Sequence, residues 1–182
     1  MQKIIAIPNI HLPSSSFVVW AQNLSNSVKD IDIFNKSVVN KTWAEMLTEL
    51  SELVDQKVAK GTELYMLTEG WGILPALAIA ESHGISGIFS IHPIIYPPST
   101  AQIHPFYQEC PKAVHLIERS QVSLDLFMPE KAFENNHRRS IKFLKSMSKP
   151  NVAVKPYEQT TLYSSDCLGE IERYILYKLG KR

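Results

Sequence analysis

Imidazole, carboxyl and hydroxyl groups follow several short apolar runs of the sequence, at points where strands are expected to end. His11 comes after residues 4–7, Glu69 after residues 64–67, His92 after residues 85–91, and Glu130 after residues 122–127. Histidine and glutamate are common general acids and bases, and a hydroxyl beside them can act as a nucleophile. One hypothesis is therefore a small esterase or thioesterase that uses His92, Glu69 or Glu130 together with one of the loop serines at 14–16. The spacing alone brings no serine oxygen within reach of an imidazole.

The histidines and cysteines form no recognisable metal-binding pattern. No two of the six histidines lie four residues apart, and Cys110 and Cys167 are far apart in the sequence. Two unpaired thiols are typical of a reducing compartment. No glycine-rich phosphate-binding motif follows a predicted strand. We therefore expect no metal, no nucleotide cofactor and a cytoplasmic location.

The most distinctive segment is residues 64–78, in which an apolar run passes into an alanine-rich and leucine-rich helix pattern. The joining residues 68–72 have glycine at the third and fifth positions, Gly70 and Gly72. Glycine adopts a positive φ without strain, which suits a tight turn from strand to helix.

This turn resembles the nucleophile elbow, G-x-S-x-G, of the α/β-hydrolases, with Gly70 at the position of the nucleophile. The resemblance implies a positive φ at this position and a small residue two positions later, where the helix approaches the sheet closely. Placing the nucleophile at Glu69 instead would put Trp71 in that narrow place. The likeness extends over nearly the whole chain and is greatest to the short, lidless serine hydrolases of the retinoblastoma-binding type. In those proteins a first strand leads to a tryptophan-containing helix, similar to residues 4–20, and a W-x-x-x-L helix like residues 43–47 precedes the elbow. The resemblance implies a strand order of 2-1-3-4-5-6. It also implies an acid after the strand at 122–127 and a histidine after the last strand.

The sequence departs from this family pattern at the catalytic positions. Gly70 has no side chain, and Glu130 stands where an aspartate is usual. The base is expected near Gln159 and Thr160, but residues 152–182 contain no histidine. Acyl transfer then lacks both the attacking group and the group that takes its proton. The sequence favours a catalytically degenerate protein that acts as a binding, regulatory or complex-forming component, with a pocket formed by Asn9, His11, Glu69, Gly70, Trp71, His92 and Glu130.

The elements that must position these residues alternate regularly along the chain. Apolar runs predict strands at 4–7, 31–34, 64–67, 85–91, 122–127 and 152–154. Helical patterns lie between and after them, and Thr42 with Glu45 predicts a capping box at the start of one helix. Residues 93–111 contain five prolines and predict a long loop. The pattern predicts a three-layer α/β/α sandwich around a mostly parallel six-stranded sheet, in one domain spanning residues 1–182.

Composition restricts the classes of partner. Hydrophobic residues make up 45% and charged residues 20%, which is ordinary for a globular domain, and the formal net charge is only +1. No overall field then attracts nucleic acid or an anionic membrane, and the basic residues at 131–149 are interpreted as a solvated helix face. The apolar stretch near Met1 is too short for a signal peptide or a membrane span. Four aromatic residues are predicted to contact a small apolar ligand or a protein partner: Trp71, Tyr96, Phe106 and Tyr107. A third hypothesis is therefore that the protein is a subunit of an assembly. The sequence leaves its oligomeric state open.

Overall fold

The six predicted strands form one parallel sheet. The structure is a computed structural model, which describes residues 1–11, 14–28, 30–36, 41–59, 61–96, 106, 109, 113–129, 135–157 and 164–180. The strand order is β2-β1-β3-β4-β5-β6, and every neighbouring pair is parallel, so the predicted order is confirmed. The strands are β1 (Gln2–Ile7), β2 (Ile31–Ile33), β3 (Glu63–Glu69), β4 (Gly87–Ile91), β5 (Ser123–Pro129) and β6 (Val152–Tyr157).

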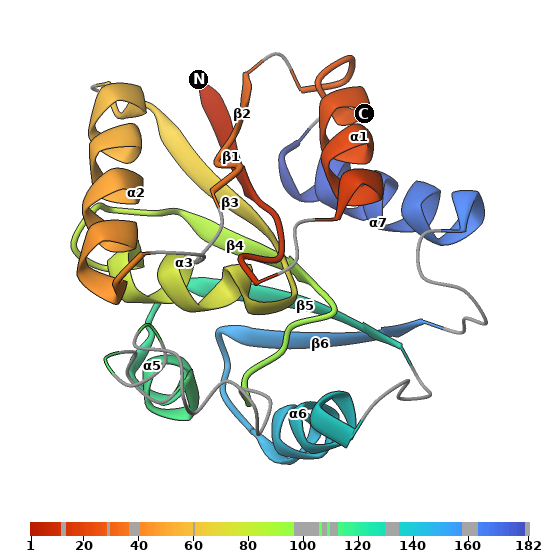
Figure 1. Cartoon of the computed structure of the whole chain (residues 1–182). Helices are drawn as coiled ribbons and strands as arrows, with labels where there is room; N and C mark the ends of the chain where they lie inside the picture. The colour runs from red at the N-terminus through yellow and green to blue at the C-terminus, as the bar shows by residue number, and fades with distance from the viewer. Residues whose placement is uncertain are drawn as a thin grey trace.

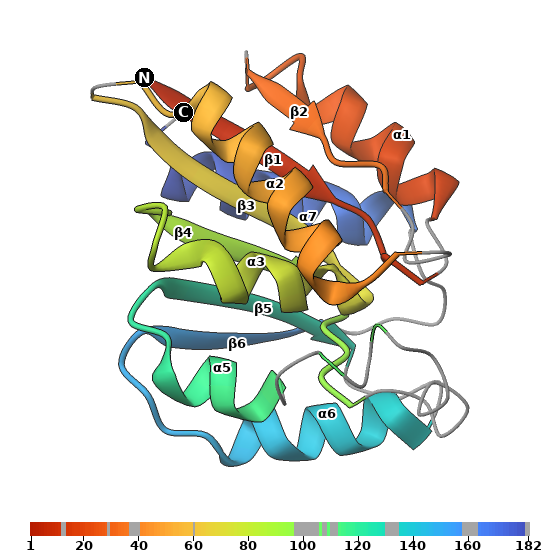
Figure 2. The same ribbon diagram turned by 60° about the vertical axis from the view of Figure 1, so that its left-hand side comes forward.

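Helices cover both faces of this sheet and complete the predicted three layers. Helices α1 and α7 lie on one face, and α2, α3, α5 and α6 lie on the other (Figures 1 and 2). Their bounds are α1 (Ser15–Leu24), α2 (Trp43–Lys57), α3 (Ile73–Ala80), α5 (Ala113–Arg119), α6 (Asn135–Ser146) and α7 (Ser165–Lys178), with a short 3-10 turn, η1 (Gly70–Gly72), before α3. Parallel strands joined through helices place all the carboxyl ends of the strands at one edge of the sheet.

The alternation of side chains along each strand divides the core in two. In β1, Ile4 and Ala6 pack with α1 and α7, whereas Ile5 and Ile7 pack with α2 and α3. All four side chains are fully buried. A strand buried on both faces reads as a continuous apolar run, which is why the sequence pattern located it.

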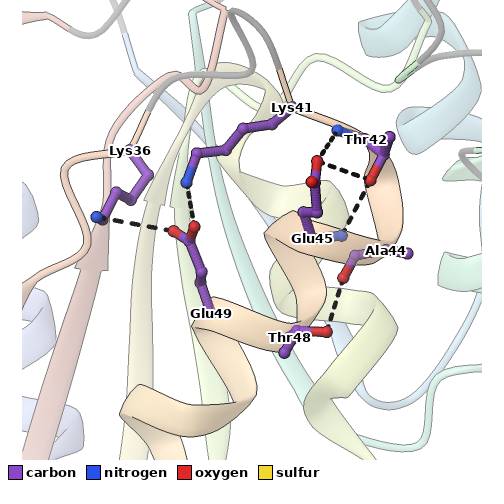
Figure 3. Close-up of polar contacts among 7 residues, drawn as sticks. All are labelled: Lys36, Lys41, Thr42, Ala44, Glu45, Thr48 and Glu49. Atoms are coloured by element: carbon purple, nitrogen blue, oxygen red, sulfur yellow. Dashed lines mark hydrogen bonds and ion pairs between the residues drawn. The ribbon is translucent and has the colours of Figure 1, made fainter.

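Helix α2 begins with the predicted capping box, so this prediction is confirmed (Figure 3). The Thr42 hydroxyl accepts the Glu45 main-chain N–H at 3.2 Å, and the Glu45 carboxylate accepts the Thr42 N–H at 2.8 Å. These hydrogen bonds lower the pKa of Glu45. One turn further on, Glu49 pairs with Lys41 and, at 3.7 Å, with Lys36. The loop before α2 is therefore held to the first turns of the helix.

Thr42→Ala is expected to lower the free energy of unfolding by about 1 kcal/mol, because it leaves the Glu45 N–H without its cap. Thr48→Ala is the matched control, since the Thr48 hydroxyl donates only to the Ala44 carbonyl within the helix, at 3.0 Å. Alanine is the better helix former, so this control is expected to leave stability within about 0.5 kcal/mol of the parent. Urea denaturation of both variants measures the difference, and equal losses would contradict the capping role.

The prediction of an unbroken loop over residues 93–111 is wrong at two positions. Phe106 and Glu109 are helical, and Phe106 is fully buried rather than exposed. The Phe106 ring packs edge-on against Trp43, with centroids 5.2 Å apart, and the Glu109 carboxylate accepts the Trp43 main-chain N–H at 3.3 Å. Contacts with a distant helix thus fix residues whose local sequence, rich in proline, gave no helical period. Tyr107 and Cys110 lie outside the described residues.

The remaining surface agrees with the expected charge distribution. Arg138, Lys142 and Lys145 are exposed on α6, as predicted for a solvated face. Arg139 lies over the Tyr96 ring at 4.4 Å, so this aromatic side chain is partly covered. Within the described ranges, no helix combines the length and the apolar character that crossing a bilayer requires.

Candidate functional site

The turn that joins β3 to α3 has its corner at Gly70. Strand β3 continues through Thr68 to Glu69, two residues further than the apolar run predicted, and Gly70 opens η1 with φ of 55°. Residues with a Cβ are strained in this region of φ, whereas glycine is not. The Gly70 carbonyl accepts the Ile94 main-chain N–H at 3.1 Å, which joins the turn to the segment after β4.

Gly72 is required for a different reason, the close approach of the turn to β1. Gly72 has helical φ of −57°, so its conformation suits any residue. A Cβ at this position would nevertheless lie 2.6 Å from the Ile7 carbonyl oxygen and 2.8 Å from that of Pro8. Both atoms belong to the main chain at the end of β1 and have no rotamer through which to move aside. The two glycines of the turn therefore serve two separate needs, one conformational and one steric.

The side chain of Asn9 lies where a side chain on Gly70 would stand. A Cβ on Gly70 would lie 3.0 Å from both Cγ and Nδ2 of Asn9. Asn9 is held in place, because its Oδ1 accepts the His11 main-chain N–H at 3.2 Å and its own N–H donates to Glu69 Oε2 at 3.1 Å. The loop after β1 thus fills the space beside the corner with a carboxamide.

Glu69 is a buried carboxyl group that connects this loop with the start of α1. Only 5% of the residue is exposed, and its carboxylate accepts hydrogen bonds from the Asn9 N–H and from the main chain and hydroxyl of Ser14. Ser14 also caps α1, since its hydroxyl oxygen accepts the Phe17 N–H at 3.2 Å. Burial raises the pKa of Glu69 to about 7, although the hydrogen bonds from Asn9 and Ser14 oppose this rise. The carboxyl group is therefore poised to change charge near neutral pH.

Two of the predicted pocket residues pack against each other beside the corner. The His11 and Trp71 rings meet edge to face, with centroids 5.3 Å apart. Trp71 is buried in the same core as α2 and α3. The structure thus brings together Asn9, Glu69 and Gly70 by direct contact, and adds His11 through its N–H to Asn9.

His92 follows β4 in an unusual backbone conformation. Its φ is 51°, it is only 4% exposed, and its main-chain N–H donates to the Phe127 carbonyl at 2.9 Å. The imidazole stacks on the Tyr157 ring at the end of β6, with centroids 5.5 Å apart and planes inclined by 15°. A positive φ at a residue with a Cβ stores about 1–3 kcal/mol of strain, so the surroundings must hold it. Sequence reasoning placed His92 at this edge but missed Tyr157, whose position depends on the far end of the sheet.

Comparison with known proteins rests on the fold, because no family model matches the chain and no curated protein matches its sequence. Solved structures do match. Est1E from Butyrivibrio proteoclasticus has a TM-score of 0.72 at 14% identity, covering 99% of this chain and 88% of that one. The alpha/beta hydrolase domain-containing protein 10 from mouse has a TM-score of 0.65 at 12% identity, covering 98% of this chain and 89% of that one. A monoglyceride lipase from Saccharomyces cerevisiae has a TM-score of 0.64 at 12% identity, covering 98% of this chain and 86% of that one. The chain has the α/β-hydrolase fold.

Within the α/β-hydrolase fold, the expected acid and base positions stay predictions. Glu130, Gln159 and Thr160 lie outside the described residues. The described part of the chain contains no cluster of three histidine, cysteine, aspartate or glutamate side chains that could hold a metal ion.

A serine and an imidazole do meet elsewhere on this fold. The Ser82 hydroxyl lies 2.8 Å from His83 Nδ1, and His83 Nε2 lies 3.8 Å from Asp55 Oδ1. Ser82 and His83 follow the C-terminal end of α3, and Asp55 lies near the C-terminal end of α2. All three are at the edge of the sheet opposite Gly70. The Ser82 hydroxyl also donates to the Ile79 carbonyl. Ligands of open α/β sheets bind at the carboxyl edge, so this cluster is assigned to the end of α3 rather than to the site.

Proposed function

We propose that the chain is a catalytically degenerate α/β-hydrolase-like protein that acts as a binding, regulatory or complex-forming component. The observation that carries this proposal is the corner of the turn, where Gly70 has no side chain and Asn9 fills the space beside it. Acyl transfer begins with attack by a side-chain oxygen or sulfur, and neither is available at this position. The proposal includes a cytoplasmic location and a small apolar ligand or protein as the partner.

The last part of the chain supports the same proposal. Residues 152–182 follow the start of the last strand and contain no histidine, so the base position near Gln159 and Thr160 lacks an imidazole. Glu130 is the residue proposed for the acid position. Without nucleophile and base, a triad enzyme retains roughly 10³–10⁴-fold catalysis over water, from substrate binding and oxyanion stabilisation.

One observation favours the alternative, a small esterase or thioesterase with a relocated site. The Ser14 hydroxyl donates to Glu69, whose pKa is about 7, and such a carboxylate can accept a proton near neutral pH. However, the Ser14 oxygen also accepts the Phe17 N–H at the start of α1, and Glu69 is buried. We therefore favour a structural role for this pair.

A fluorophosphonate probe and short-chain p-nitrophenyl esters distinguish the two functions. We expect no serine of the parent protein to become labelled and no ester hydrolysis above that of a Ser14→Ala variant. The double variant Gly70→Ser/Asn9→Ala should also remain unlabelled, because residues 152–182, where the base is expected, contain no histidine. Covalent labelling of Ser14, or of any other serine in the parent, would overturn the degenerate reading.

Gly70→Ser alone is expected to lower the free energy of unfolding by about 2 kcal/mol, through backbone strain and contact with Asn9. Gly84→Ser is the matched control, because Gly84 has φ of 63° but open space around its Cβ position. This control should cost only the strain, about 1 kcal/mol. The loss of unfolding free energy caused by Gly70→Ser should exceed the loss caused by Gly84→Ser, and this excess should shrink in an Asn9→Ala background. Urea denaturation measures it. An unchanged excess would contradict the contact with Asn9.

A further inference from the structure

We propose that a cavity under α7 binds a small monocarboxylate with an aromatic or branched apolar body. The cavity has a volume of about 160 Å³ and lies between the carboxyl ends of β5 and β6 and the first half of α7. It is separate from the corner at Gly70, so the proposal stands whether or not the protein hydrolyses esters.

The size and floor of the cavity fit an apolar group of about benzene size. Phe127, Cys167 and Ile171 line it and are all buried. An apolar cavity of about 150 Å³ is large enough to take up benzene. Burial raises the pKa of the Cys167 thiol to about 11, with Glu170 adding to the rise, so the thiol stays neutral. It therefore contributes to the apolar lining and does not act as a nucleophile.

The charges at the rim select the sign of the ligand. Lys155 lines the cavity with its ammonium group 5.1 Å from the centre of the Tyr174 ring, and no carboxylate within the described ranges pairs with it. Lys178, which also lies over this ring, is by contrast 3.7 Å from the buried Asp125 carboxylate. Glu170 is the acidic residue at the rim, but it is exposed, so solvent screens its charge. The partly buried Lys155 is thus the stronger determinant and favours an anion.

Tyr157 lines the cavity without offering a polar group to a ligand. Its hydroxyl is fully buried and has no hydrogen-bond partner among the residues that the structure describes. Because solvent does not reach this oxygen, a ligand in the cavity does not reach it either. The ammonium of Lys155 is therefore the group that would recognise the carboxylate.

Titration of the full chain with benzoate, benzyl alcohol and benzylamine tests the proposal. These three probes have similar size and differ in charge, and binding is followed by chemical shifts of the purified protein. We expect benzoate to bind saturably and about tenfold more tightly than benzyl alcohol, because a hydrogen bond to a charged group is stronger than one to a neutral group. Tighter binding of benzylamine, or no saturation by benzoate up to about 10 mM, would overturn it.

Three variants locate the binding. Lys155→Met should weaken benzoate binding about tenfold and leave benzyl alcohol unchanged, since it removes the charge and keeps the length of the side chain. Glu170→Gln should tighten benzoate binding about twofold, because it removes a screened like charge. Lys142→Met removes an exposed lysine from α6 and is expected to change neither affinity. Equal effects of the two lysine variants would indicate non-specific attraction and refute the site.

Discussion

Gly72→Ala is expected to lower the free energy of unfolding by about 3 kcal/mol or to prevent folding. The added methyl would lie 2.6 Å from the Ile7 carbonyl oxygen and 2.8 Å from that of Pro8, inside normal contact distance. Relief requires the end of β1 and the start of α3 to move apart, which also disturbs Asn9 and the corner at Gly70. Overpacking of this kind costs roughly 1–3 kcal/mol and more where the main chain is involved. Urea denaturation measures the loss.

Gly169→Ala provides the matched control for this prediction. Gly169 lies within α7, and a Cβ there would meet no atom within 4 Å. Alanine at such a position should raise the free energy of unfolding by about 1 kcal/mol, because glycine is the poorer helix former. The two identical substitutions are thus expected to have opposite signs. Similar effects at both positions would mean that the turn does not approach β1 as described.

The second large effect concerns Glu69 and pH. The folded-state pKa is raised from 4.5 to about 7, so the folded protein must hold a buried charge once the pH exceeds this value. Below about pH 4.5 the Glu69 carboxyl group is protonated in both the folded and the unfolded protein, and its contribution to the free energy of unfolding is at its maximum. That contribution is lost as the pH rises to about 7, and the total loss is about 3 kcal/mol at 1.36 kcal/mol per pKa unit. The contribution of Glu69 to the free energy of unfolding therefore falls between about pH 4.5 and 7 and does not change further above pH 7.

Glu69→Gln isolates this effect, because glutamine does not titrate. The difference in unfolding free energy between the parent and the variant should fall by about 3 kcal/mol between pH 4.5 and 7. Denaturant titrations across this range measure it. Glu52→Gln, on the exposed side of α2, is the control and should give a nearly flat difference. A difference that rises with pH at Glu69 would show instead that Asn9 and Ser14 stabilise the carboxylate more than burial disfavours it.

Local patterns in the sequence were sufficient for most of the elements, whereas the order of the strands in the sheet was predicted from the resemblance to the α/β-hydrolases. The apolar run ending at Ile7 located a strand buried on both faces, and Thr42 with Glu45 located the start of α2. Gly70 and Gly72 located the turn, because glycine is the residue expected where φ is positive or where a side chain has no space. These features depend on neighbours in the chain or on one nearby strand end.

The contacts that define the site could not be read in this way. Asn9 against Gly70, and His92 against Tyr157, join segments that are distant in the sequence and adjacent only once the sheet has formed. Their geometry depends on the register of several strands and on the path of the loops. The helical state of Phe106 has the same origin, since burial against Trp43 outweighs a local sequence without helical period. Tertiary contacts, rather than propensity, decide these positions.

The carboxamide beside Gly70 makes the order of mutations matter. A side chain at position 70 would meet Asn9, and a smaller residue 9 would by itself give up the hydrogen bond to His11. The effects of substitutions at the two positions are therefore expected not to add. A variant made at one position alone would misjudge what the pair does together.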